Sequence, residues 1–110
     1  MQGNSNNRYT EKKYFLLRLI APRPTFAIDM TPEEMQVMQA HGAYLKKYVE
    51  EGTVIVMGPV LDPKGSWGVA IMEVESEKEV QSIIAQDPTI LSGLGFRYEV
   101  LPMFRAIVRK

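Results

Sequence analysis

The stretch TPEEMQVMQAHGAYLKKYVEEG, residues 31–52, predicts one long amphipathic helix. Thr31 can cap its first turn, Pro32 suits the first helical position, and Glu34 completes a capping box. Gly52 predicts the end of the helix, because glycine readily adopts the left-handed conformation found there. Small or apolar residues recur at steps of three and four and predict the face that packs on a sheet: Met35, Met38, Gly42, Leu45 and Val49.

This helix carries His41, the only histidine of a chain that has no cysteine. Histidine is the side chain that ordinarily titrates near neutral pH, so His41 is the first candidate for proton transfer. Helical spacing places it at the edge of the apolar stripe, beside Val37, Tyr44 and Tyr48, where a side chain can face the mouth of a pocket. The alternative is a structural histidine that hydrogen-bonds a neighbour.

The segments around the helix predict an α+β fold of the ferredoxin-like βαββαβ type. A hairpin follows the helix, because residues 53–61 and 67–74 read as strands joined by a short turn. Strands are also predicted at residues 13–20 and 96–108, and a second helix at residues 77–86. This order favours a four-stranded antiparallel sheet with both helices on one face. The other face would stay apolar and bare, which predicts a homodimer that closes two sheets face to face.

Two irregular segments are candidates for pocket walls. Residues 21–30 contain two prolines, which predicts a loop without regular structure, and apolar Phe26 suggests that this loop folds back as a lid or binding loop. Gly58 and Pro59 interrupt a predicted strand, which indicates a bulge, an edge or a close approach of the backbone. A glycine there would also let a ligand come near the chain.

Composition limits the possible functions. The chain of 110 residues is the size of one domain, and its 13 basic residues balance 13 acidic ones, which disfavours nucleic acid and anionic membranes as partners. The first ten residues are polar, so we expect residues 1–12 to be a disordered lead-in and residues 13–110 to form a single domain. No apolar run approaches the roughly 20 residues of a membrane helix, and we expect a cytoplasmic protein.

Motifs for nucleotides and metals are missing. The sequence has no phosphate-binding glycine loop, no serine elbow and no dinucleotide fingerprint. A single histidine with carboxylates is a weak zinc site. We therefore expect no metal and no cofactor.

Several short motifs occur along the chain, in the order KYFLLR at 13–18, His41, GPVLDP at 58–63, Trp67-Gly68 and Asp87-Pro88. In this ordered set of motifs the chain resembles the YciI-like (YCII-related) proteins, over nearly its whole length after Thr10. The resemblance implies dimeric α+β barrels of ferredoxin-like protomers. It also implies an active site proposed to be a His–Asp pair, and a fold similar to that of a dehydrochlorinase of chlorinated hydroxyquinol breakdown. Most members have no assigned substrate.

Carried over to this chain, the resemblance implies His41 and Asp87 as a catalytic dyad. A carboxylate bonded to one imidazole nitrogen fixes the tautomer and raises the basicity of the ring, which leaves the other nitrogen to move a substrate proton. Asp87 also has a structural alternative, because aspartate before proline at a helix end commonly bonds the backbone in a turn.

Six further residues are candidates for substrate binding. Arg18 is the one cation on an apolar strand face, where it either extends to the rim or contacts an anion in a cleft. Trp67 either stacks on an aromatic substrate or packs at the dimer interface. The others are Phe26, Gly58, Pro59 and Ser66.

The favoured function is a cofactor-independent enzyme, a dehydrochlorinase-like lyase or an isomerase, that acts on a phenolic or enolisable small molecule. The alternative is a non-catalytic dimer that binds a small ligand or regulates another process. An oxygen-dependent, heme-free monooxygenase is a third possibility, because that chemistry also uses ferredoxin-like dimers.

Overall fold

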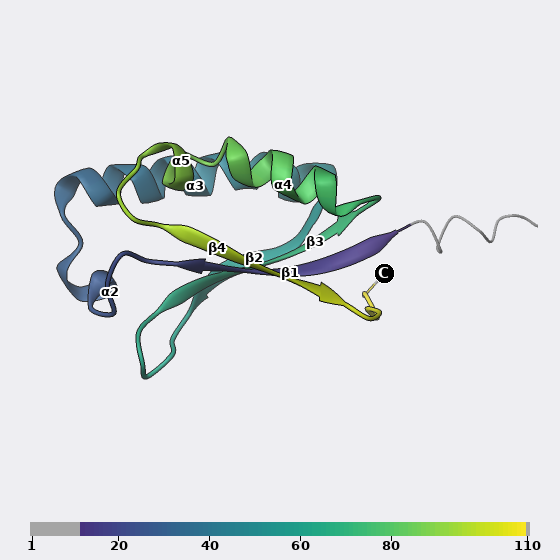
Figure 1. Ribbon diagram of the computed structural model, residues 1–110, viewed down its shortest axis with the longest axis horizontal. Coiled ribbons are helices and arrows are strands. Elements are labelled where there is room, and N and C mark those ends of the chain that lie inside the picture. Colours follow the sequence, from purple (N-terminus) through teal and green to yellow (C-terminus); the bar gives the residue numbers. More distant parts are fainter. Residues whose placement is uncertain (1–11, 110) are drawn as a thin grey trace, which may run out of the picture.

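Four antiparallel strands form one sheet in the order β2-β3-β1-β4, in a computed structural model that describes residues 12–109. Three helices, α3, α4 and α5, lie together over one face of this sheet, and α2 lies at its end (Figure 1). The ferredoxin-like α+β prediction is confirmed for the protomer. The predicted lead-in falls outside the described residues except for Lys12. The elements in chain order are β1 Lys13–Ile20, α2 Phe26–Asp29, α3 Pro32–Glu51, β2 Val54–Val60, β3 Trp67–Val74, α4 Glu77–Ala85, α5 Pro88–Leu91 and β4 Arg97–Met103.

The core lies between the sheet and the helix layer. Alternation along the central strand β1 directs Phe15, Leu17 and Leu19 toward the helices, where all three are buried. Leu17 pairs with Ala70 of β3 on one side and with Val100 of β4 on the other. Other fully buried apolar side chains come from α3, α4, β2 and β3, namely Leu45, Val54, Met72, Val74 and Val80.

Helix α3 begins and ends where the sequence predicts. The Thr31 hydroxyl accepts from the Glu34 amide at 3.1 Å, the Glu34 carboxylate accepts from the Thr31 amide at 2.9 Å, and Gly52 closes the helix at φ 93°. The predicted packing face is wrong in part, since Met35 and Val49 are 47% and 39% exposed.

The face of α3 that packs on the sheet is centred on His41 and Leu45, and it also buries Glu34. His41 therefore faces the interior of the fold instead of lying at the edge of a stripe. Hydrophobic periodicity assigns polar residues to solvent, but both polar residues here have hydrogen-bonding partners that make burial possible.

Three boundaries differ from the prediction. The last strand ends at Met103, which pairs with Tyr14, the second residue of β1. Beyond Met103, the register leaves only Lys13 of β1 as a further partner. The predicted loop at residues 21–30 contains one turn of helix, α2, and its two prolines precede that turn, where a fixed φ is tolerated. A short helix, α5, occupies the start of the predicted connection after Asp87.

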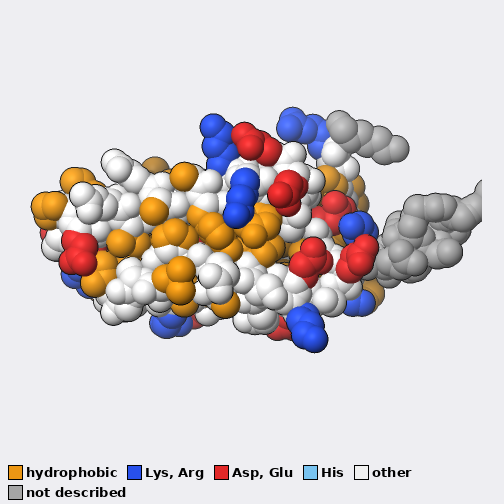
Figure 2. Space-filling view, turned by 90° about the horizontal axis from the view of Figure 1, so that it is seen from above, with side chains coloured by type: hydrophobic (Ala, Val, Ile, Leu, Met, Phe, Trp, Pro, Cys, Tyr) orange, Lys and Arg blue, Asp and Glu red, His pale blue; other side chains and the backbone are white. Residues whose placement is uncertain are grey.

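The outer surface of the helix layer carries charged side chains of both signs. Figure 2 shows apolar side chains along the middle of this face, with basic and acidic side chains lying close to one another around them. Such a mixture gives no field of one sign for a polyanion. Among the helices between residues 12 and 109, none is long and apolar enough to cross a membrane.

Candidate active site

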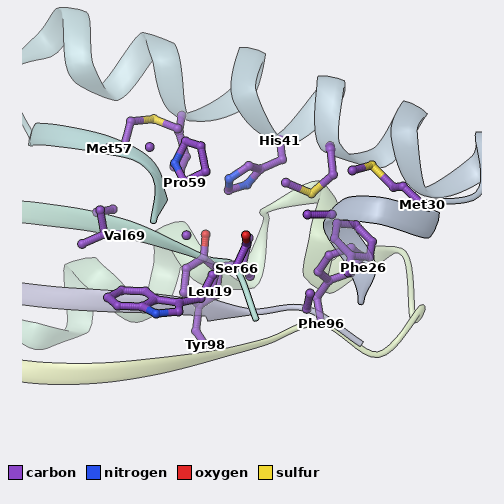
Figure 3. A pocket seen from close by; sticks show the side chains of 18 residues that line it. Leu19, Phe26, Met30, His41, Met57, Pro59, Ser66, Val69, Phe96 and Tyr98 are labelled. Atoms are coloured by element: carbon purple, nitrogen blue, oxygen red, sulfur yellow. The ribbon is translucent and has the colours of Figure 1, made fainter. Parts of the chain in front are cut away.

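A cavity of about 210 Å³ opens between the sheet, α3 and α2. Its walls are almost entirely apolar and include Leu19, Phe26, Met57 and Phe96. Three side chains with polar groups also line it, His41 from α3, Ser66 from the β2–β3 turn and Tyr98 from β4 (Figure 3). An apolar cavity with a few convergent polar groups is the usual form of a small-molecule site.

His41 and Asp87 are in contact at this cavity. The ring Nδ1 donates to the Asp87 carboxylate at 2.9 Å to Oδ2 and 3.1 Å to Oδ1. The Asp87 side chain is 1% exposed and the His41 side chain 10%, so the carboxylate lies behind the ring as seen from the cavity. Nε2 has no hydrogen-bond partner within residues 12–109, and the ring points into the cavity (Figure 3).

Three more donors hold the Asp87 carboxylate. Asp87 caps α5, and both the amide and the hydroxyl of Thr89 donate to Oδ1 at 2.9 Å. The Tyr98 hydroxyl donates to Oδ2 at 2.5 Å. Burial alone would raise the pKa of the Asp87 carboxyl, but the hydrogen bonds from His41 and Tyr98 outweigh it, so the pKa lies below its ordinary value. Asp87 is therefore a fixed anion at neutral pH.

Five of the six proposed substrate-binding residues line the cavity, namely Phe26, Gly58, Pro59, Ser66 and Trp67. Arg18 does not, because alternation along β1 places its side chain on the other face of the sheet. Its guanidinium forms an ion pair of 3.0 Å with Glu99 and lies 4.3 Å from the centre of the Trp67 ring. The indole N–H of Trp67 donates to Asp62 at 3.0 Å. In this structure Arg18 is thus a surface cation stacked on an aromatic ring.

Sequence reasoning missed Thr89 and Tyr98. A signal for Thr89 existed, because Asp-Pro-Thr is typical of a helix start whose aspartate accepts the amide two residues on. Tyr98 had no local signal. Its role depends on the register of β4, in which Tyr98 pairs with Leu19 and so shares the cavity face of the sheet.

Arg23 fixes the α2 wall of the cavity. Its guanidinium bonds Asp29 at 2.8 Å and the Glu34 carboxylate at 2.8 and 2.9 Å, which ties α2 to the start of α3. The hydrogen bonds from Arg23 are the main reason that the pKa of Glu34 falls to about 2. Phe26 packs edge-on against Phe96, with ring centres 5.3 Å apart. Helix α2 is therefore held in place by the ion pairs of Arg23 and by the packing of Phe26 on Phe96.

A close contact at Gly65 supports the same wall and leads to a prediction. Gly65 has φ 128°, and a Cβ atom there would lie 3.0 Å from the Pro24 carbonyl oxygen. We expect Gly65→Ala to lower the free energy of unfolding by about 1–3 kcal/mol, because the backbone is strained and Pro24 must move. Chemical denaturation measures the change.

The matched control is Gly42→Ala, where no atom lies within 4 Å of the added Cβ. Alanine in a helix interior is favoured over glycine by roughly 0.5–1 kcal/mol, so this variant should gain stability. Equal effects of the two substitutions would contradict the contact with Pro24.

The sequence pattern of the YCII-related domain matches residues 14–104. The chain belongs to the YCII-related family. This YCII-related protein is similar in structure to the 5-chloro-2-hydroxyhydroquinone dehydrochlorinase TftG of Burkholderia phenoliruptrix, solved in complex with 2,5-dihydroxybenzoquinone. The two share 28% sequence identity with a TM-score of 0.56, over 78% of this chain and 89% of that one.

A second solved structure, the uncharacterized protein TM1266 from Thermotoga maritima, is 11% identical with a TM-score of 0.48, over 84% of this chain and 99% of that one. No curated protein matches the chain.

Proposed function

We propose that this YCII-related protein is a cofactor-independent lyase or isomerase that removes a proton from a phenolic or enolisable small molecule, with His41 as the general base and Asp87 as its orienting partner. The observation that carries the proposal is the arrangement of His41. Its Nδ1 donates to a buried carboxylate at 2.9 Å while its other nitrogen faces an apolar cavity. A base within reach of a bound substrate is the first geometric requirement of such catalysis.

The proposed step follows from the tautomer. With the proton on Nδ1 directed at Asp87, the lone pair of Nε2 is free to accept a proton from a substrate hydroxyl or from carbon beside a carbonyl. The imidazolium that forms is stabilised by the Asp87 anion behind it. On the substrate, the electron pair left on oxygen forms a carbonyl while the ring carbon that bears the halide takes up a proton, which the imidazolium can return. Loss of a proton from a second ring hydroxyl then forms a second carbonyl and expels the halide. The net loss is one proton and one halide, so the reaction needs no oxidant or reductant.

The cavity favours an uncharged ring as the substrate. Its described lining has no Asp, Glu, Lys or Arg side chain, so nothing there compensates a charged group. Phe26 and Phe96 offer aromatic surface, and the Ser66 hydroxyl offers a hydrogen bond to a second substrate oxygen. The likeness to TftG, whose name specifies a chlorinated hydroxyhydroquinone, supports this choice of ring.

The test is chloride release from 5-chloro-2-hydroxyhydroquinone by the purified protein under anaerobic conditions, followed with a chloride electrode and by ultraviolet absorption. We expect turnover above the rate without protein. Binding without chloride release would favour a non-catalytic ligand-binding dimer. Oxygen uptake that accompanies turnover in air, with none under nitrogen, would favour a monooxygenase instead.

We also propose that the protein is a homodimer that joins two copies through the sheet face opposite the helices. That face carries apolar side chains at its surface, among them Val56 and Leu101, and Leu101 is 48% exposed. Beyond β4 the chain adds Phe104 and Ile107, which are almost fully exposed. Apolar area of this kind usually marks an interface.

For the dimer, we expect Leu101→Asp to shift the mass in sedimentation or light scattering from two chains to one, because a charge would be buried between the sheets. The control is Leu91→Asp, since Leu91 is an exposed apolar residue on α5, in the helix layer. A native protein that already sediments as one chain at high concentration would contradict the proposal.

A further inference from the structure

The Asp87 carboxylate is saturated with hydrogen bonds. A carboxylate offers about four lone-pair positions, and Asp87 receives four donors from three residues, the Nδ1–H of His41, the amide and hydroxyl of Thr89, and the hydroxyl of Tyr98. The side chain is almost completely inaccessible to solvent. Only the bond to His41 is needed to hold the imidazole, so the other three donors need a separate explanation.

The three donors other than His41 come from two elements, and they bond different oxygens of the Asp87 carboxylate. Thr89 lies in the first turn of α5 and bonds Oδ1, while Tyr98 bonds Oδ2 from β4, in the sheet below the helix layer (Figure 1). The Oδ2 atom that Tyr98 bonds is also the nearer acceptor of His41, at 2.9 Å. Tyr98 and His41 therefore share the negative charge of one oxygen.

We propose that Tyr98 and Thr89 are positioning residues that divide the charge of Asp87 and so limit how tightly it holds the proton of His41. Each hydrogen bond to an anion lowers its strength as an acceptor toward its other donors. A base that must return its proton after each turnover works best when it holds that proton neither too weakly nor too tightly. The role of Tyr98 and Thr89 in catalysis rests on the proposed function. Their effect on how tightly Asp87 holds the His41 proton does not.

The other titratable group near the carboxylate is Tyr44 from α3. Its hydroxyl donates to the Ile83 carbonyl at 2.7 Å and not to Asp87. Burial, followed by the neighbouring Tyr48 phenol, raises the pKa of Tyr44, and burial together with the bond to Asp87 raises that of Tyr98. Both phenols are therefore neutral at pH 7, and Asp87 is the only anion that His41 contacts among the described residues.

The test follows the ring resonances of His41 by NMR as pH is varied, in protein without a histidine tag. Because the chain has one histidine, its signals need no assignment. We expect Tyr98→Phe and Thr89→Val each to move the titration midpoint upward by about half a pH unit. Each removes one hydrogen bond from the Asp87 carboxylate and leaves that carboxylate a stronger acceptor for the proton of His41. Thr89→Ser keeps the hydroxyl and should restore the native midpoint.

Tyr44→Phe is the matched control, because it removes a half-buried phenol hydroxyl near the same carboxylate, and this hydroxyl bonds Ile83 and not Asp87. Its midpoint should stay at the native value. A midpoint that stays or falls in both Tyr98→Phe and Thr89→Val, or that rises equally in Tyr44→Phe, overturns the proposal. If Tyr98→Phe does not fold, the comparison of Thr89→Val with Thr89→Ser decides alone. No substrate is needed, so failure of the proposed function and failure of this inference give different results.

Discussion

His41→Gln is expected to reduce the rate of chloride release from the chlorinated hydroxyhydroquinone by about 100- to 10,000-fold, the usual contribution of a positioned general base. Glutamine has an amide N–H that can still donate to Asp87, so the buried carboxylate keeps a partner. Its amide has no basic nitrogen, so it cannot accept a substrate proton. The loss should appear in kcat, with a much smaller change in KM, because the apolar walls that bind the ring are unchanged.

The control for this prediction is Met38→Leu. Met38 lies one turn before His41 on the same helix and lines the same cavity, but it has no proton chemistry. Exchange of two side chains of similar volume costs little packing energy, so its rate should stay close to that of the native protein. If His41→Gln keeps the native rate, His41 is not the base. If both variants lose activity equally, the effect belongs to the shape of the cavity.

Much of the protomer fold could be predicted because its signals are local. The capping pair Thr31 and Glu34, the glycine at the end of α3 and the short turn between β2 and β3 each act over a few residues. The extent of β4 could not be predicted in this way, because a strand ends where its partner ends. Composition alone could not limit it to Met103.

The site was less predictable, since it depends on which face of the sheet the helices cover. Alternation along β1 separates Arg18 from Leu19 but does not say which of them faces α3. Arg18 was therefore a reasonable candidate that the structure places on the opposite face from the cavity. The pairing of His41 with Asp87 came from the family resemblance, because no local signal joins residues that far apart in sequence.

Asp87→Ala is expected to lower the free energy of unfolding by about 3–5 kcal/mol, the usual cost of removing one partner from a buried charged pair. The truncation leaves four buried donors without their acceptor, on His41, Thr89 and Tyr98. Glu99→Ala provides the comparison, because it breaks two solvent-exposed ion pairs, with Arg18 and with Arg97. Surface ion pairs contribute little, so this variant should cost about 0–1 kcal/mol. Urea unfolding of both variants measures the difference, and equal losses would contradict the role of Asp87 as a common acceptor.

Asp87→Asn separates stability from catalysis at the same position. The amide oxygen of asparagine can still accept from Thr89, so part of the network survives and the loss of stability should be smaller than in Asp87→Ala. Its NH2 group would then face the Nδ1 of His41, which must become an acceptor and transfer its proton to Nε2. The nitrogen that faces the substrate would no longer be basic. Turnover should therefore fall as far as in His41→Gln, and near-native turnover in Asp87→Asn would mean that the carboxylate does not set the tautomer of the base.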